Sequence, residues 1–277
     1  SAWRVNSPKH LIASLFAYTA HPMTNFLTLL MREYKNMQVY TESLGPFATN
    51  AYILDWTQAV NVQKRDDIFY AIDAPWGSFA YYKDFAEKNK KTLSTLFLTH
   101  SHQDHIGDVA QIVDYFDNIQ IVIANNELDF LLLPGSDGLP LAADVPAMKK
   151  KHYSKIVPVT IPTSCASHNK LPSLALPTTL KRHTNIPLPT LFHCPGHSTG
   201  SICYFFEDSN TLFSGDTIMH GTCGRIDLPG GSKQEMLASL QRIPSTFKGS
   251  TLIFSGHGPS TTLAAESTWL SSIEYML

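Results

Sequence analysis

The stretch that decides the fold is "LTHSHQDHIGD", Leu98 to Asp108, where three histidines and two aspartates fall within eleven residues. It follows the apolar run "LSTLF" directly, and such a run is typical of a buried strand. Burying several ionisable groups together is costly unless they are coordinated or paired. The pattern His-x-His-x-Asp-His therefore predicts a metal site at the end of a strand, built from His100, His102, Asp104 and His105.

More ligands are needed than this cluster supplies. Imidazole and carboxylate suit zinc, iron or manganese, and one tetrahedral ion takes three or four ligands. Further candidates each follow a glycine: His197 in "CPGHSTG", Asp216 in "SGDT" and His257 in "SGHGP". Taken singly, such a histidine is more often a core or capping residue, and such an aspartate a turn residue. Beside the first cluster, metal ligation becomes the favoured interpretation.

The order of predicted elements indicates a layered α/β fold. Strands are expected over 37–44, 51–56, 67–75, 93–100, 119–125, around a turn in 190–208, and over 211–218 and 250–259; helices are expected over 76–91, 108–116, 232–243 and 260–277. Ser232 and Glu235 form a capping box at the start of one helix. His100, Asp216 and His257 each follow a short apolar run, and such strand ends tend to meet at one edge.

Two segments stand outside this pattern. Residues 1–36 precede the first expected strand, so we predict an N-terminal extension followed by one domain over 37–277. Residues 134–189 hold nine of the chain's 17 prolines, and proline interrupts both helices and sheets. We expect this stretch to be an irregular insertion with a hairpin or two, lying as a lid or rim.

Composition excludes several classes of protein. Lys and Arg number 21 against 23 Asp and Glu, so no basic surplus favours a nucleic-acid partner. No apolar run reaches the roughly 18 residues of a membrane span. Four cysteines in 277 residues predict free thiols in a reducing compartment, the cytoplasm. No G-x-S-x-G elbow is present for a serine nucleophile. We expect a small-molecule substrate and a monomer or homodimer.

These motifs resemble the metallo-β-lactamase superfamily, which carries the His-x-His-x-Asp-His signature. Within it, "GDTIMHGTCGRIDLPGGS" at 215–232 and "GHGPSTTLAAE" at 256–266 are similar to the glyoxalase II-like hydrolases, meaning hydroxyacylglutathione hydrolase and its short bacterial relatives. The resemblance covers roughly 37–133 and 190–277. It implies a four-layer αββα sandwich with the metal site at one edge of the two sheets.

The same resemblance implies a role for each candidate residue. Two divalent ions are implied, with zinc expected and iron or manganese as alternatives: His100, His102 and His197 would hold the first, Asp104, His105 and His257 the second, and Asp216 would bridge both. Asp73 would support the ligand loop without touching an ion. Arg225 would bind the glycine carboxylate of glutathione; the competing interpretation is a surface arginine paired with Asp227.

The reaction implied is thioester hydrolysis. Two ions can share a hydroxide, because coordination lowers the pKa of water from about 15.7 to about 7, and they also polarise the substrate carbonyl. Asp104 would orient that hydroxide and later carry its proton. Two features resemble the short relatives: only 20 residues follow His257, and Asp227 stands where an aromatic residue is expected.

Other activities remain open at this point. A persulfide dioxygenase resembles the same motifs but uses one iron held by two histidines and one aspartate. A hydrolase of another ester or a lactone is also compatible. The segment "GRIDLPGG" does not favour a β-lactamase, and a nuclease would need a basic surface. A metal-stabilised protein without catalysis is disfavoured, because seven apparent ligands for two ions leave room for water.

Overall fold

The computed structural model describes residues 37–56, 67–136, 138–139, 141, 144–162, 169–183 and 186–276. The extension predicted over 1–36 and one of the four cysteines, Cys165, lie outside these residues. Within the described ranges, no helix has the length and apolar character needed to cross a membrane.

The first sheet has six strands in the order β1-β2-β3-β4-β5-β6. Their bounds are β1 Gln38–Leu44, β2 Thr49–Asp55, β3 Ile68–Ile72, β4 Thr92–Phe97, β5 Gln120–Ala124 and β6 Ile156–Val159. β1, β2 and β3 pair antiparallel, whereas β3 to β6 run parallel. The parallel half needs crossover helices, which cover its outer face.

The second sheet also has six strands, in the order β12-β11-β10-β9-β8-β7. Their bounds are β7 Ser173–Leu174, β8 Thr190–His193, β9 Ile202–Phe206, β10 Thr211–Gly215, β11 Leu252–Ser255 and β12 Thr261–Thr262. β10 and β11 pair in parallel, and the other neighbours are antiparallel.

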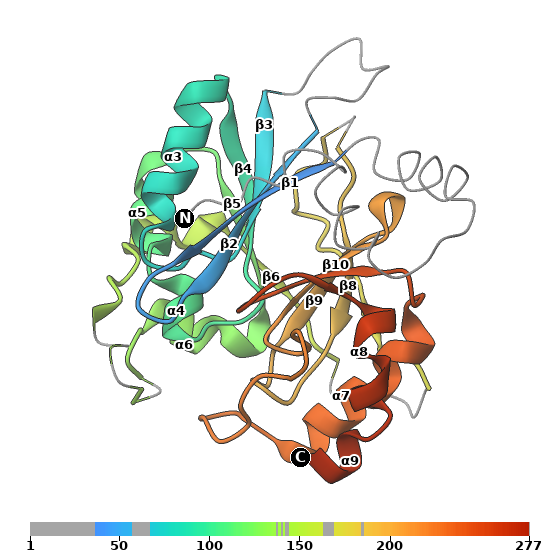
Figure 1. The fold of residues 1–277 in the computed structure, drawn as a ribbon. Helices are drawn as coiled ribbons and strands as arrows, with labels where there is room; N and C mark the ends of the chain where they lie inside the picture. The colour runs from blue at the N-terminus through green and yellow to red at the C-terminus, as the bar shows by residue number, and fades with distance from the viewer. Residues whose placement is uncertain are drawn as a thin grey trace, which may run out of the picture.

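The helices lie on the outer faces of the two sheets, as Figure 1 shows. Their bounds are α3 Ser78–Asn89, α4 Gln103–Ile106, α5 Val109–Tyr115, α6 Leu128–Leu132, α7 Lys233–Thr246, α8 Leu263–Leu270 and α9 Ile273–Met276, with short 3-10 turns at Asn125–Glu127, Lys150–Lys155 and Glu207–Ser209. Alternation along β3 divides its side chains: Phe69 packs with the α3 and α5 side, and Tyr70 with the core between the sheets. A third apolar cluster joins the second sheet to α7 and α8. The predicted four-layer sandwich is confirmed.

Aromatic side chains fill the space between the sheets and tie their strand ends together. The rings of Phe213 and Phe254 stack with centroids 5.3 Å apart, and Tyr52 packs edge-on against both. Buried tyrosines need a partner for the hydroxyl. Tyr204 of the second sheet donates to the carbonyl of Leu98 in the first, at 2.6 Å. This bond holds the backbone just before the predicted metal motif.

The proline-rich stretch 134–189 is more regular than the irregular insertion we expected. In its described part, β6 pairs in parallel with β5, not in a hairpin, and β7 forms the edge of the second sheet. The reason lies in the alternation of "IVPV": Val157 and Val159 are buried between the sheets. Pro158 between them is exposed at an edge strand, where its missing N–H costs little.

The C-terminal stretch also differs from the single helix expected over 260–277. Thr261 pairs with Ile253 in β11, so the segment begins as a short strand. The hydroxyl of Thr262 then accepts from the amide of Ala265 and caps α8.

The capping box predicted at Ser232 is confirmed for one of its two hydrogen bonds. The hydroxyl of Ser232 accepts from the Glu235 amide at 3.3 Å.

The bond between Tyr204 and Leu98 yields a stability prediction. Tyr204→Phe leaves a buried carbonyl without its hydroxyl donor, so we expect the free energy of unfolding to fall by about 1–3 kcal/mol. Urea unfolding measures this loss. Tyr115→Phe is the matched control, since its hydroxyl bonds Glu87 at the surface, and a change within about 0.5 kcal/mol is expected. Equal effects of the two variants would contradict the prediction.

Candidate metal centre

The predicted ligands lie at the ends of strands from both sheets. His100 follows β4 of the first sheet, while Asp216 and His257 follow the parallel strands β10 and β11 of the second. His197 lies in the loop between β8 and β9. The two sheets pack face to face, so these four strand ends reach the same edge of the sandwich. All seven side chains predicted as ligands fall into groups whose ligand atoms lie within 4.8 Å of one another.

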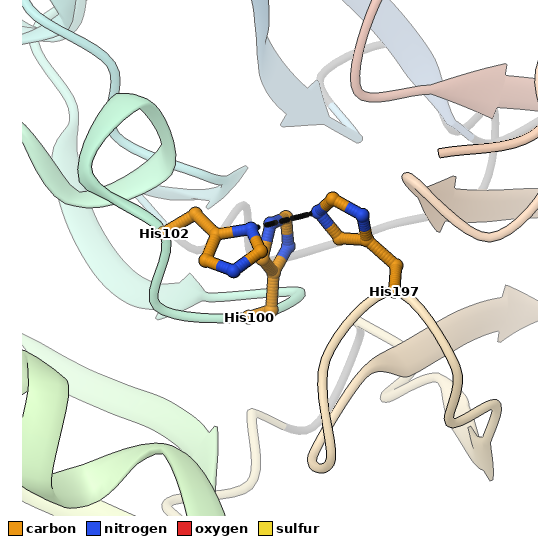
Figure 2. Close-up of side chains that lie close together, drawn as sticks. All are labelled: His100, His102 and His197. Carbon is orange, nitrogen blue, oxygen red and sulfur yellow. Dashed lines mark hydrogen bonds between the residues drawn. The ribbon is translucent and has the colours of Figure 1, made fainter. Parts of the chain in front are cut away.

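Three histidines form the first group, shown in Figure 2. The Nε2 atom of His197 lies 2.8 Å from Nδ1 of His102 and 3.1 Å from Nε2 of His100. All three side chains are buried. Two nitrogens bound at 2.0–2.1 Å to one tetrahedral ion lie about 3.3 Å apart, so the spacing suits a shared ion.

Asp104, His105 and His257 form the second group. The Asp104 carboxylate lies 3.6 Å from Nε2 of His105 and 3.2 Å from Nε2 of His257. Unlike the first group, this one is partly open: the side chains of His257 and Asp104 are 28% and 16% exposed. A substrate can therefore approach the centre from this side.

Asp216 lies between the two groups. Its carboxylate approaches His197 of the first group at 3.4 Å. It approaches His105 at 3.5 Å and His257 at 3.4 Å in the second. One carboxylate thus contacts both groups, as a bridging ligand must.

Unpartnered atoms indicate what the centre would hold. Nε2 of His105 and Oδ1 of Asp216 are buried and have no hydrogen-bond partner. A buried polar atom without a partner is expensive, and coordination to a cation is one way to satisfy it. Nitrogen and carboxylate donors in this number fit divalent zinc, iron or manganese.

Asp73 supports the ligand loop directly behind the ligands. Its carboxylate lies 2.8 Å from Nδ1 of His105 and accepts the amide of Thr99, also at 2.8 Å. The Thr99 hydroxyl in turn lies 3.0 Å from Nδ1 of His100. Asp73 has the left-handed φ of 58°, which aspartate tolerates better than most residues. Such contacts fix ring orientation and leave Nε2 free for an ion.

Backbone carbonyls orient two more histidines. Nδ1 of His197 lies 2.7 Å from the carbonyl oxygen of Arg225, and Nδ1 of His257 lies 3.1 Å from that of Phe47. Thr49 donates to the Asp104 carboxylate at 2.8 Å. Sequence reasoning missed Thr49 and Thr99; Thr99 precedes His100 directly, which was the only available signal.

Electrostatics divide the histidines into two kinds. Burial, reinforced by the neighbouring imidazoles, lowers the pKa of His102 to about 3 and that of His100 well below its ordinary value. Both are therefore neutral, as metal ligation requires. At His257, burial also lowers the pKa, but hydrogen bonds to Asp104 and Asp216 outweigh it and raise the value to about 9. An ion bound by these carboxylates would have to displace that proton.

Of the other residues singled out by sequence, Arg225 has an exposed side chain. Its guanidinium donates twice to Asp227, from Nε at 2.7 Å and from Nη2 at 2.6 Å. Both side chains are more than 60% exposed, so the pair is solvated and weak.

The chain matches the Metallo-beta-lactamase superfamily over residues 74–257, a range that contains every predicted ligand. The chain belongs to the metallo-β-lactamase superfamily. Among its relatives, "Probable metallo-hydrolase YqgX" of Bacillus subtilis is 30% identical over 80% of this chain and 91% of the relative. A "Hydroxyacylglutathione hydrolase" of Bartonella henselae is 29% identical over 68% of this chain and 56% of the relative.

Solved structures of superfamily relatives have the same fold. The BLEG-1 B3 metallo-beta-lactamase is 29% identical with a TM-score of 0.62, and TTHA1623 in a di-iron-bound form is 26% identical with a TM-score of 0.59. Each comparison covers 83% of this chain and 97% of the other. The superfamily binds divalent metals, in keeping with the histidine and aspartate groups described above.

Gly256 allows a direct test of the centre. A Cβ at this position would overlap Oδ1 of Asp216 and lie 2.8 Å from Cε1 of His105, so Gly256→Ala must displace ligands. We expect bound metal per chain to fall at least tenfold, measured by elemental analysis after dialysis against a weak chelator. Gly249→Ala is the control, because its Cβ would make an ordinary 3.6 Å contact with Ala264. Wild-type metal content in Gly256→Ala would refute the assignment.

Proposed function

We propose that this protein is a metal-dependent hydrolase of thioesters of the hydroxyacylglutathione type. The observation that carries the proposal is the position of Asp216, whose carboxylate contacts both ligand groups. A shared carboxylate suits a pair of ions acting on one substrate. The relative from Bartonella henselae supports the choice of thioester.

In this proposal each ion has its own ligands. His100, His102 and His197 would hold the first ion, Asp104, His105 and His257 would hold the second, and Asp216 would be shared. Zinc is the expected metal. Iron is the alternative, since one relative of known structure is described in a di-iron-bound form.

The residues of the chain divide the remaining work. Bound ions would lower the pKa of water to about 7 and polarise the scissile carbonyl. Asp104 lies at the open side of the centre, where Thr49 donates to Oδ2, and in this proposal its carboxylate orients the attacking water and takes its proton. Asp73 holds His105 in one ring orientation through Nδ1. The leaving thiolate needs no acid from the protein, because the pKa of a thiol, about 8.5, is low enough for the group to leave as the anion.

Arg225 is the proposed substrate-binding residue. Its peptide carbonyl lies against His197, so the residue is joined to the first ligand group through the backbone. An arginine can make a bidentate contact to a carboxylate such as that of the glutathione glycine. Asp227 now occupies that fork, and the substrate carboxylate would have to replace it. Exposure of the pair makes this exchange inexpensive.

The proposal predicts metal-dependent hydrolysis of S-D-lactoylglutathione. Asp104→Asn keeps the size of the side chain but removes its charge and basicity, so we expect kcat to fall by about 10²-fold or more. Chelation of the metal should abolish turnover by the wild-type protein, and added Zn²⁺ should restore that turnover. Asp114→Asn, at an exposed carboxylate that contacts Lys149, is the control.

Three results would overturn the proposal of metal-dependent thioester hydrolysis. The first is turnover that persists in metal-free protein. The second is a protein that binds two ions per chain and leaves the thioester intact, which would favour another ester, a lactone or a β-lactam. The third is a single iron per chain together with oxygen consumption on a persulfide, which would favour a dioxygenase.

The role of Arg225 predicts a separate kinetic effect. Arg225→Ala removes a charge-assisted contact, so KM for the glutathione thioester should rise about tenfold or more while kcat stays within about twofold. Asp227→Asn should lower KM, because the guanidinium no longer has a competing carboxylate. For a thioester that lacks the glycine carboxylate, KM should be the same in both variants as in the wild type. Equal KM values for all three proteins would contradict substrate binding by Arg225.

A further inference from the structure

Glu127 is a buried carboxylate that the proposed reaction does not use. It ends the 3-10 turn directly after β5, and only 1% of the residue is exposed. Its Oε2 atom accepts the amide of Ser101 at 3.0 Å and the hydroxyl of the same residue at 2.5 Å. Its Oε1 atom accepts the amide of Gly200 at 2.8 Å. Three donors thus converge on one carboxylate.

The residues that Glu127 contacts lie beside ligands. Ser101 stands between His100 and His102, and Gly200 lies three residues after His197. The first loop leaves β4 of the first sheet, and the second connects β8 to β9 of the second sheet. Glu127 therefore ties together two loops that come from different sheets and carry the three histidines of the first ligand group.

The fit around this carboxylate is close. A Cβ on Gly200 would lie 2.6 Å from Cγ of Glu127 and 2.9 Å from Cβ of Ala124. Only glycine lets the backbone approach the acid to hydrogen-bond distance. In the described part of the chain, no lysine or arginine forms a salt bridge with Glu127. Two backbone amides and one hydroxyl donate to the carboxylate and offset the cost of its burial.

We propose that Glu127 is a positioning residue of the metal centre. It sets the separation of the loop bearing His102 from the loop bearing His197, whose ring nitrogens lie 2.8 Å apart. Apart from contacts between the histidine rings themselves, the two segments are also joined by a backbone hydrogen bond from the Ile202 amide to the Thr99 carbonyl at 2.9 Å. Ligands that are already held at the right separation bind an ion more tightly, because the two loops need not move together first. The inference rests on the metal site of the proposed function, not on its substrate.

Glu127→Gln tests this role with little change in shape. Glutamine keeps one acceptor oxygen and places an NH2 group against the donor of the other loop, so one of the two links is lost. We expect affinity for the first Zn²⁺ to fall about tenfold or more, measured by competition with a chromophoric chelator. The visible absorption of the Co²⁺-substituted protein should change as well, because it reports the ligand geometry. Circular dichroism at the same temperature checks that the variant is folded.

Asp55→Asn is the matched control. Asp55 is also buried and forms an ion pair with Lys91, but it ends β2 at the edge of the sheet opposite the ligands. The variant should lower the free energy of unfolding and leave Zn²⁺ affinity within about twofold of the wild type. This result would show that removing a buried carboxylate weakens metal binding only when that carboxylate joins the ligand loops.

Two results would overturn the proposal. One is wild-type Zn²⁺ affinity and Co²⁺ absorption in a folded Glu127→Gln protein. The other is an equal loss of affinity in Asp55→Asn, which would mark a general effect of stability. These readouts do not depend on the substrate. A wild-type protein that binds two ions but leaves the thioester intact overturns the thioester hydrolase and not the role of Glu127.

Discussion

Burial of four histidines with Asp216 at one edge of the sandwich is the constraint on which this structure depends. Ionisable groups at that depth are stable only if each atom has a partner. The surrounding fold supplies most of them: carboxylates, carbonyls and hydroxyls occupy the outward atoms of the rings. Nε2 of His105 and Oδ1 of Asp216 lie 3.5 Å from each other and have no hydrogen-bond partner. The protein thus presents an electron-rich cluster that a divalent cation would complete.

The two ligand groups differ in access, and this difference bears on the reaction. The histidine group is closed, whereas His257 and Asp104 reach solvent. Asp216 joins a buried half to an open half, so a substrate would meet the side that holds Asp104, the proton acceptor of the proposed reaction. Phe47, which is 44% exposed and positions His257 through its carbonyl, lies at the same opening.

Support for the centre comes from residues scattered through the chain. Tyr204 holds the strand that leads into the motif, Asp73 holds His105, and Glu127 joins the loops of the two sheets. Each acts from a different strand or turn, and each is buried. Ligand positions are therefore a property of the packed sandwich, and no single loop determines them.

The sequence by itself determined the class of fold and indicated a metal site. A cluster such as His100 to His105 after an apolar run, with further candidates at other strand ends, indicates a metal site in a layered α/β fold. Ligand spacing and strand periodicity depend on residues close together in the chain, so the sequence alone can show them. Packing decided the rest. Burial of Val157 and Val159 between the sheets places β6 in the first sheet despite the nearby prolines. Pairing with β11 makes Thr261 part of a short strand where a helix was expected. The contact of Glu127 with Gly200 joins residues 73 apart in sequence, so only the meeting of two sheets could reveal it.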